Sequence, residues 1–283
     1  MRFLPKMPLD HWIEYLLDVL TDNLSWLTKG ISDVMETGIE GIVDAILWVP
    51  AGVTILALGL LAWRLAGRKI ALLTTLGLFF IWNLDLWAPM VSTLSLVLIS
   101  TLIAVTLAIP LGIIAGLNKR VYQFLKPALD LMQTMPAFVY LIPAIPFFGL
   151  GPVAAIFSTV IFSIPPAIRL TALGIRQVDP ELIEACDAFG STHMQKLTKV
   201  QLPLAMPTIM AGVNQTIMLA LSMVVIASMI GAGGLGGEVW RAIQRLRPGQ
   251  GFEAGIAVVV LAMILDRLTQ SMAGPNRSSE EEL

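Results

Sequence analysis

The most constraining feature of the sequence is an apolar run at residues 91–117, which contains no charged side chain: VSTLSLVLISTLIAVTLAIPLGIIAGL. A helix needs about 20 such residues to cross the roughly 30 Å hydrocarbon core of a bilayer. A strand of a membrane barrel would instead alternate apolar and polar side chains, and this run does not alternate. The run therefore predicts a membrane-spanning α-helix.

Similar runs recur along the chain, which is 56% hydrophobic and only 13% charged, whereas an ordinary soluble domain is about 25% charged. The predicted fold is an all-α, polytopic membrane helical bundle with about seven transmembrane helices. The expected spans are 49–65, 70–86, 91–117, 127–150, 153–170, 207–230 and 255–268. A net charge of −2, one cysteine and two distant histidines give no signal for nucleic acid, an internal disulfide or a metal site.

Residues 1–47 are predicted to form one or two amphipathic helices, because apolar residues recur at three- and four-residue steps and acidic residues fill the other face. These helices would lie on the membrane or pack on other protein, and the sequence leaves both open. Of the 18 lysines and arginines, seven spans would place twelve on one side and six on the other. The richer side is expected to be cytoplasmic, so residues 1–47 lie outside and residues 273–283 form a disordered cytoplasmic tail.

The segment GAGGLGG at residues 231–237 contains the G-x-G-x-x-G spacing of dinucleotide-binding folds. That spacing has its usual meaning only after a short buried strand, and here it follows a long apolar helix. The run is instead predicted to be a flexible break, because glycine tolerates positive φ. A short external or re-entrant helix is expected to follow it.

Residues 169–201 form the only long cytoplasmic loop that the sequence predicts, and they are ordered rather than linker-like. Asp179 is expected to cap a helix that begins at Pro180 and ends where Gly190 adopts a left-handed turn. Its apolar face would hold Leu182, Ala185, Cys186 and Phe189. Ser191 is expected to cap a second helix, which would end at Leu202-Pro203.

The sequence EACDAFGSTHMQKLTKVQLP in this loop resembles the EAA loop of ABC-type importer permeases. The matching positions are Glu184, Ala185, Gly190, Leu202 and Pro203, with Cys186 in place of an alanine and Val200 in place of an isoleucine. QTMPAFVYLIPAIPFFGLG, the region around GAGGLG, and LAMILDRLTQ look like the glycine betaine, proline betaine and choline branch of these permeases.

The resemblance implies the type I permease fold of ABC importers, with residues 48–272 as the transmembrane permease domain and residues 171–203 as its coupling loop. It implies a homodimer in the bacterial plasma (inner) membrane, two cytosolic ABC ATPase subunits, and an external or periplasmic substrate-binding protein. The chain has no G-x-x-x-x-G-K-[ST] phosphate loop. It is therefore expected to be a transport subunit without catalytic residues or cofactors, whose partner ATPase holds ATP and Mg²⁺.

The residues expected to couple to the ATPase are Glu184, Ala185, Cys186, Gly190, Val200, Leu202 and Pro203. The candidates for the translocation path are Gln133, Tyr140, Phe147, Asn214, Gln215, Ser222 and Ser228. For each polar residue in that set, a hydrogen bond between helices is the alternative. The candidate dock for the binding protein comprises Glu238, Trp240, Arg241 and Arg245, which could equally anchor the chain at the membrane interface.

Two other readings remain open. An ion-coupled secondary transporter would need ionisable residues inside the membrane and usually an internal repeat, and the expected spans hold almost no such residues. A permease for another small solute such as methionine would share the loop and differ only in its substrate.

Overall fold

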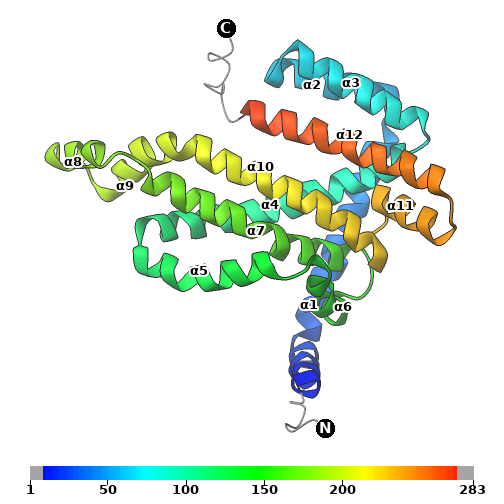
Figure 1. The fold of residues 1–283 in the computed structure, drawn as a ribbon, viewed down its shortest axis with the longest axis horizontal. Helices are drawn as coiled ribbons and strands as arrows, with labels where there is room; N and C mark the ends of the chain where they lie inside the picture. The colour runs from blue at the N-terminus through cyan, green and yellow to red at the C-terminus, as the bar shows by residue number, and fades with distance from the viewer. Residues whose placement is uncertain (1–8, 273–283) are drawn as a thin grey trace, which may run out of the picture.

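The computed structural model describes residues 9–272 and contains helices only within that range. In chain order the elements are α1 (Leu9–Trp48), α2 (Ala51–Ala66), α3 (Arg68–Asn83), α4 (Trp87–Leu117), α5 (Lys119–Thr134), η1 (Ala137–Tyr140), α6 (Leu141–Phe148), α7 (Pro152–Arg176), α8 (Pro180–Ala188), α9 (His193–Lys196), η2 (Leu197–Gln201), α10 (Leu202–Ala227), η3 (Ser228–Ile230), α11 (Gly234–Gln244) and α12 (Pro248–Met272). Figure 1 shows α4, α7 and α10 side by side, with the α2–α3 hairpin next to α12.

Helix α7 lies at the centre of the bundle because small residues let its neighbours approach closely. On α4, Ser100, Ala104, Ala108, Gly112 and Gly116 follow one another at four-residue steps. A Cβ on Gly112 would lie 2.6 Å from the Cβ of Thr171, and one on Gly116 would lie 3.0 Å from the Cβ of Ile175. Residue numbers rise together along both helices, so α4 and α7 are parallel.

The other close neighbour of α7 is α10, which runs antiparallel to it. Gly174 of α7 faces Ala205 and Thr208 of α10, whereas Gly212, further along α10, faces Leu170. Gly174 and Gly212 are both buried. The two interfaces bury most of α7, which makes it the scaffold on which the other elements sit.

By length and composition, three helical segments could each cross a membrane: Trp87–Leu117, Pro152–Arg176 and His193–Ile230. Two further bent pairs, α1 with α2 and α5 with the segment Ala137–Phe148, bring the number to five if each pair is one span. All of these lie within the described residues. The bundle of apolar helices is confirmed, while the number seven remains a prediction.

The expected span at 127–150 is not one straight helix, because α5 and the following helical segment Ala137–Phe148 are bent by 111°. The break falls at Met135-Pro136. A residue before proline is driven out of the α region, and Met135 is extended, with φ −70° and ψ 136°. Helix α7 also continues to Arg176, so the start of the expected cytoplasmic loop is helical.

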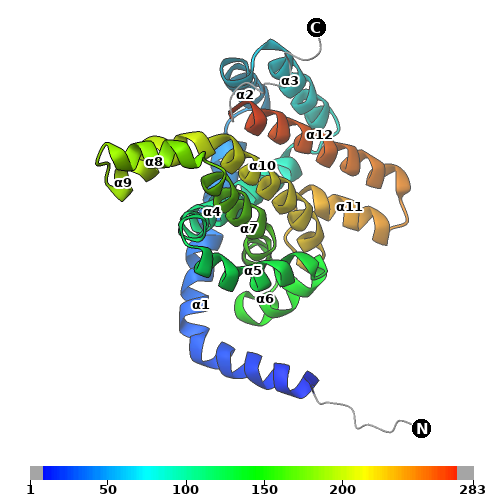
Figure 2. The same ribbon diagram turned by 60° about the vertical axis from the view of Figure 1, so that its left-hand side comes forward.

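The N-terminal region is a single helix within the described residues, α1, where one or two were expected. It is bent by 98° relative to α2, and Figure 2 shows that α1 also curves along its own length. Its second half packs against the bundle and buries Ile39, whereas Trp12 and Trp26 are exposed. Residues 1–8 and the expected tail at 273–283 lie outside the described residues.

The glycine run forms a break followed by a short helix, as predicted. Gly231, Gly233 and Gly234 all have positive φ, at +94°, +74° and +68°. Helix α11 begins there, and the backbone N–H of its buried Leu235 donates a 2.8 Å hydrogen bond to Oγ1 of Thr93 on α4. The run therefore ties the end of α10 to the start of α4.

Candidate coupling elbow and translocation face

The two short helices after α7 form an elbow, defined here as residues 179–201. Its first helix, α8, begins as predicted: Oδ1 of Asp179 accepts a 2.9 Å hydrogen bond from the Glu181 N–H, and Pro180 takes the first position. Gly190 ends it with φ +71°. Figure 1 shows the elbow projecting beyond one end of α7 and α10.

The second helix of the elbow differs from the prediction at both of its ends. Its cap is Thr192 rather than Ser191, because the Thr192 N–H donates to the Gln195 side chain at 2.8 Å and the Gln195 N–H donates back to Oγ1 of Thr192. This is the S/T-x-x-E/Q capping box, which was visible in the sequence as THMQ.

The helix also does not end at Leu202-Pro203, since residues 193–230 are continuous. A π-helical turn at Leu197–Gln201 lets the Leu202 N–H donate to the Leu197 carbonyl. Pro203 follows as the second residue of α10, and the π turn accommodates its missing N–H within the continuous helix. The elbow is therefore joined to α10 without a flexible link.

An ion pair closes the elbow, and sequence analysis did not identify it. Nζ of Lys196 lies 2.5 Å from Oδ1 of Asp187, and the Lys196 side chain is only 11% exposed. The sequence signal for this ion pair was a pair of opposite charges nine residues apart, one on each side of the Gly190 turn. The pair holds α8 against the second helix and fixes the angle between them.

The predicted coupling residues are distributed over the tip and the base of this elbow. Glu184 and Ala185 are exposed, and Cys186 is half-buried. Val200 and Leu202 are half-buried at the base, where Leu202 packs against the cluster of Ile175, Ala205 and Ile209. The tip also exposes Phe189, at 91%, and Met194, at 67%. The tip thus presents an apolar surface next to a carboxylate.

The path candidates on α10 point in two directions. Gln215 and Ser222 are exposed, seven residues apart on one face. Asn214 instead faces α12, where its Nδ2 donates a 2.8 Å hydrogen bond to Oδ1 of Asp266. The Ser228 hydroxyl donates to the Val225 carbonyl within its own turn.

The path candidates on the bent segment are likewise divided. Gln133 is exposed near the end of α5, and Phe147 is half-buried beside Phe148. Tyr140 is buried, and its hydroxyl donates to the Met132 carbonyl across the bend. Figures 1 and 2 both place α7 between α5 and α10, whereas η1, which carries Tyr140, contacts α10 directly.

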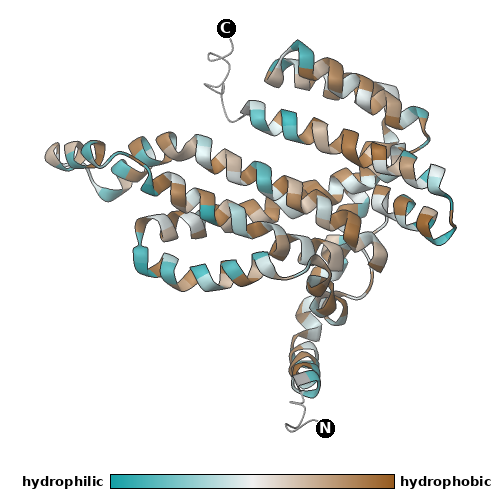
Figure 3. Ribbon diagram, viewed as in Figure 1, coloured by the Kyte–Doolittle hydropathy of each residue, from teal (hydrophilic) through white to brown (hydrophobic). Residues whose placement is uncertain are grey.

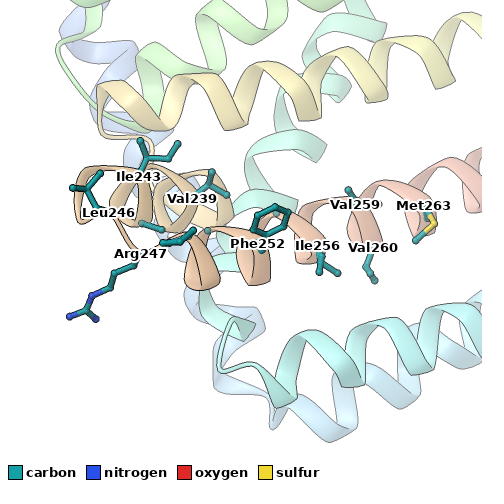
Figure 4. A pocket seen from close by; sticks show the side chains of 13 residues that line it. Val239, Ile243, Leu246, Arg247, Phe252, Ile256, Val259, Val260 and Met263 are labelled. Carbon is teal, nitrogen blue, oxygen red and sulfur yellow. The ribbon is translucent and has the colours of Figure 1, made fainter.

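The proposed dock lies on α11, at the opposite end of the bundle from the elbow. Glu238 and Arg241 form an ion pair one turn apart, Trp240 is half-buried, and Arg245 is exposed. Between α11 and α12 lies an open apolar groove of about 910 Å³. Figure 4 shows Arg247 at one end of this groove, extending away from its apolar lining.

Residues 108–273 match the family described as binding-protein-dependent transport system inner membrane components. The match runs from the second half of α4 to the end of α12 and includes the elbow. The chain belongs to this family.

Three relatives extend the likeness over almost the whole permease chain. The glycine betaine/carnitine transport permease protein GbuB of Listeria monocytogenes is 52% identical, with 99% of both chains covered. The glycine betaine transport system permease protein OpuAB of Bacillus subtilis is 48% identical, over 97% of this chain and 98% of the relative. The glycine betaine/proline betaine transport system permease protein ProW of Escherichia coli is 46% identical, over 96% and 77%.

Among solved structures, an inward-facing structure of the MetNI methionine ABC transporter matches this permease with a TM-score of 0.55. The sequences are 22% identical, and the match covers 64% of this chain and 93% of the other. This likeness confirms the type I permease fold. The family is one of transport components, so the chain is a membrane permease rather than an enzyme.

Proposed function

We propose that this chain is the membrane-spanning permease subunit of an ATP-driven importer for glycine betaine and related quaternary ammonium osmoprotectants. The observation that carries the proposal is the elbow, whose sequence resembles the EAA loop of these permeases and whose second helix is continuous with α10. Relatives at 46–52% identity are named for glycine betaine, together with proline betaine or carnitine in two of the three. A relative named for choline is 32% identical over 60% of this chain, so choline is the weaker candidate.

In the proposed mechanism the permease acts as a homodimer with two cytosolic ATPase subunits and an external binding protein. The ATPase binds ATP and Mg²⁺, and its closure pushes on the elbow. Because the π turn and α10 continue the elbow's second helix, the push reaches the far end of the bundle at Gly231. There α10 adjoins α11, on which we place the dock for the binding protein.

The lining of the path remains a proposal, and the geometry favours the exposed candidates. Gln215 and Ser222 on α10 and Gln133 on α5 are exposed in the single subunit. Asn214 and Tyr140 are engaged inside the subunit. We place the elbow on the cytoplasmic side and α11 on the outer side, and the N-terminal helix is then expected to lie outside.

The test is uptake of labelled glycine betaine into vesicles that hold this permease with its ATPase and binding protein, with and without internal ATP. We expect uptake that requires ATP and that excess unlabelled proline betaine blocks. Uptake that follows an ion gradient and ignores ATP would contradict the proposal. ATP turnover with uptake of methionine but no betaine would leave the permease assignment and change its substrate.

A further inference from the structure

Helix α5 carries a polar stripe along its whole length, defined here as Lys119, Gln123, Lys126, Asp130 and Gln133. The steps of four, three, four and three residues place all five on one face of the helix. On the adjoining side of the helix, Leu125, Leu129 and Met132 pack against Ala108, Ala167 and Ile168. Phe124 and Leu131, on the side away from the stripe, are exposed. Figure 3 shows α5 as more hydrophilic than α7 and α10.

By length and composition, α5 and the segment Ala137–Phe148 could together form one bent span. Helices α4 and α7 are parallel, so α5, η1 and α6 must return the chain from one end of the bundle to the other. A polar stripe at that depth is unfavourable against lipid, and intramembrane charges face protein or a water-filled path. The stripe therefore faces the path or another subunit.

One charge of the stripe is paired across to the central helix. Nη2 of Arg169 on α7 lies 2.6 Å from Oδ1 of Asp130, and the two side chains are 29% and 48% exposed. Among the described residues, the structure records no other hydrogen bond to either side chain. Both side chains are therefore only partly covered in the single subunit.

The pair is not required to hold α5 in place. The guanidinium of Arg176 lies 3.9 Å from the centre of the Tyr122 ring on α5, and its Nη2 donates to the Ala115 carbonyl at 2.5 Å. Together with the apolar face of α5, these contacts dock the helix independently. The Asp130–Arg169 pair can thus open without releasing α5.

We propose that the Asp130–Arg169 pair is a transient binding site for a zwitterionic quaternary ammonium substrate. The substrate carboxylate takes the place of Asp130 on the Arg169 guanidinium, and the trimethylammonium group lies against the Asp130 carboxylate. A partly exposed ion pair contributes little net stability, so its exchange for the substrate is nearly balanced. Such a site binds its substrate weakly and releases it readily, and the Asp130–Arg169 ion pair then re-forms. This inference rests on the proposed function.

The test measures ligand protection of a thiol introduced by Gln133→Cys, three residues from Asp130 on the same stripe, in a Cys186→Ser background. The reconstituted complex is labelled with a maleimide in glycine betaine or in choline chloride, with the ionic strength matched by sodium chloride. With the pair intact, we expect glycine betaine at about four times its Kd to slow labelling roughly fivefold, and choline at the same concentration to do so less.

Neutralising the two partners should have opposite effects. Arg169→Gln leaves a free carboxylate, so choline should protect better than glycine betaine. Asp130→Asn leaves a free guanidinium, so choline should lose its protection while glycine betaine keeps part of its own. If the pair had only a structural role, Arg169→Gln and Asp130→Asn would both break it and would change protection by choline and by glycine betaine to the same extent. That result would overturn the inference.

The parent variant and the unmodified permease separate this inference from the proposed function. If the unmodified permease takes up betaine but the parent Gln133→Cys thiol is protected by neither ligand, the inference fails and the function stands. If the unmodified permease takes up no betaine with ATP present, the proposed function fails first.

Discussion

At the scale of single residues, Gly190 is a position where the backbone conformation itself favours glycine. Its φ of +71° lies in the left-handed region, and a Cβ there would have no neighbouring atom within 4 Å. A substitution thus acts through the backbone alone, at a cost of about 1–2 kcal/mol for most L residues. Asparagine is the exception, because it tolerates this conformation.

We expect Gly190→Val to change the elbow angle and to lower betaine uptake per ATP hydrolysed, while the subunit still inserts. Gly190→Asn is the matched control and should keep most of the uptake. The measurement is the ratio of uptake to phosphate release in reconstituted vesicles. Normal coupling in Gly190→Val would show that the elbow angle is not what transmits ATP closure.

Gly112 tests the close approach of α4 and α7. A Cβ there would lie 2.6 Å from the Thr171 Cβ and 2.9 Å from the Ile168 carbonyl oxygen, so Gly112→Val must separate the two helices. Overpacking of this kind costs about 1–3 kcal/mol. We expect a lower thermal unfolding midpoint for the detergent-solubilised subunit.

The control for Gly112 is Gly41→Ala on α1, where a Cβ meets no atom within 4 Å. Alanine has the higher helix propensity, so this change should leave the midpoint unchanged or raise it slightly. Equal losses in both variants would mean that α4 and α7 do not depend on the glycine contact.

Thr93 holds the start of α11, since its Oγ1 accepts the hydrogen bond of the buried Leu235 N–H. Thr93→Val keeps the shape and removes the acceptor, which leaves a buried donor unpaired at a cost of about 1–3 kcal/mol. We expect faster amide hydrogen exchange at Leu235 and a lower unfolding midpoint. Thr93→Ser retains the hydroxyl and should restore both; failure of that rescue would count against the hydrogen bond.

At the scale of elements, the elbow depends on the Asp187–Lys196 pair. Removing the carboxylate leaves a nearly buried ammonium without its partner, whereas removing the ammonium leaves only the more exposed carboxylate. Removing the partner of a buried charge destabilises a protein more than removing the partner of an exposed one, because the buried charge is left uncompensated. The two substitutions should therefore differ.

We expect Asp187→Asn to reduce uptake per ATP more than Lys196→Met, which retains the apolar stem of the side chain. The comparison uses the same vesicles and measures insertion separately by the amount of subunit recovered. A larger loss in Lys196→Met would indicate that the lysine contacts the ATPase instead of closing the elbow.

The elements also show where local sequence signals were sufficient. Asp179 acts on the neighbouring Glu181 N–H, and Pro180 and Gly190 act through their own backbone, so the roles of all three in α8 could be predicted without the fold. The π turn at Leu197–Gln201 could not be predicted in this way. The sequence Leu202-Pro203 is typical of a helix end, and the helix continues through it only because the preceding π turn accommodates the hydrogen bond that Pro203 cannot donate. Thr192 was a missed local signal, since Gln195 identifies it as the cap.

At the scale of the whole molecule, α10 connects the elbow to the glycine break and α11. Its antiparallel contact with α7 is close at Gly174 and Gly212, so the helix moves against a tightly packed surface. The polar stripe of α5 and the exposed face of α10 both remain open in the single subunit.

The sequence by itself determined the class of fold and the helix–turn–helix of the elbow. Long runs without charge have no stable solution other than membrane helices, and cap and turn residues act on their immediate neighbours. Only the tertiary structure decided which residues meet across helices: Thr171 against Gly112, Asp266 against Asn214, and Arg169 against Asp130. These contacts depend on helix direction, rotation and close approach, which arise from the packing of α4, α5, α10 and α12 around α7 and its neighbours and are not encoded at any single position.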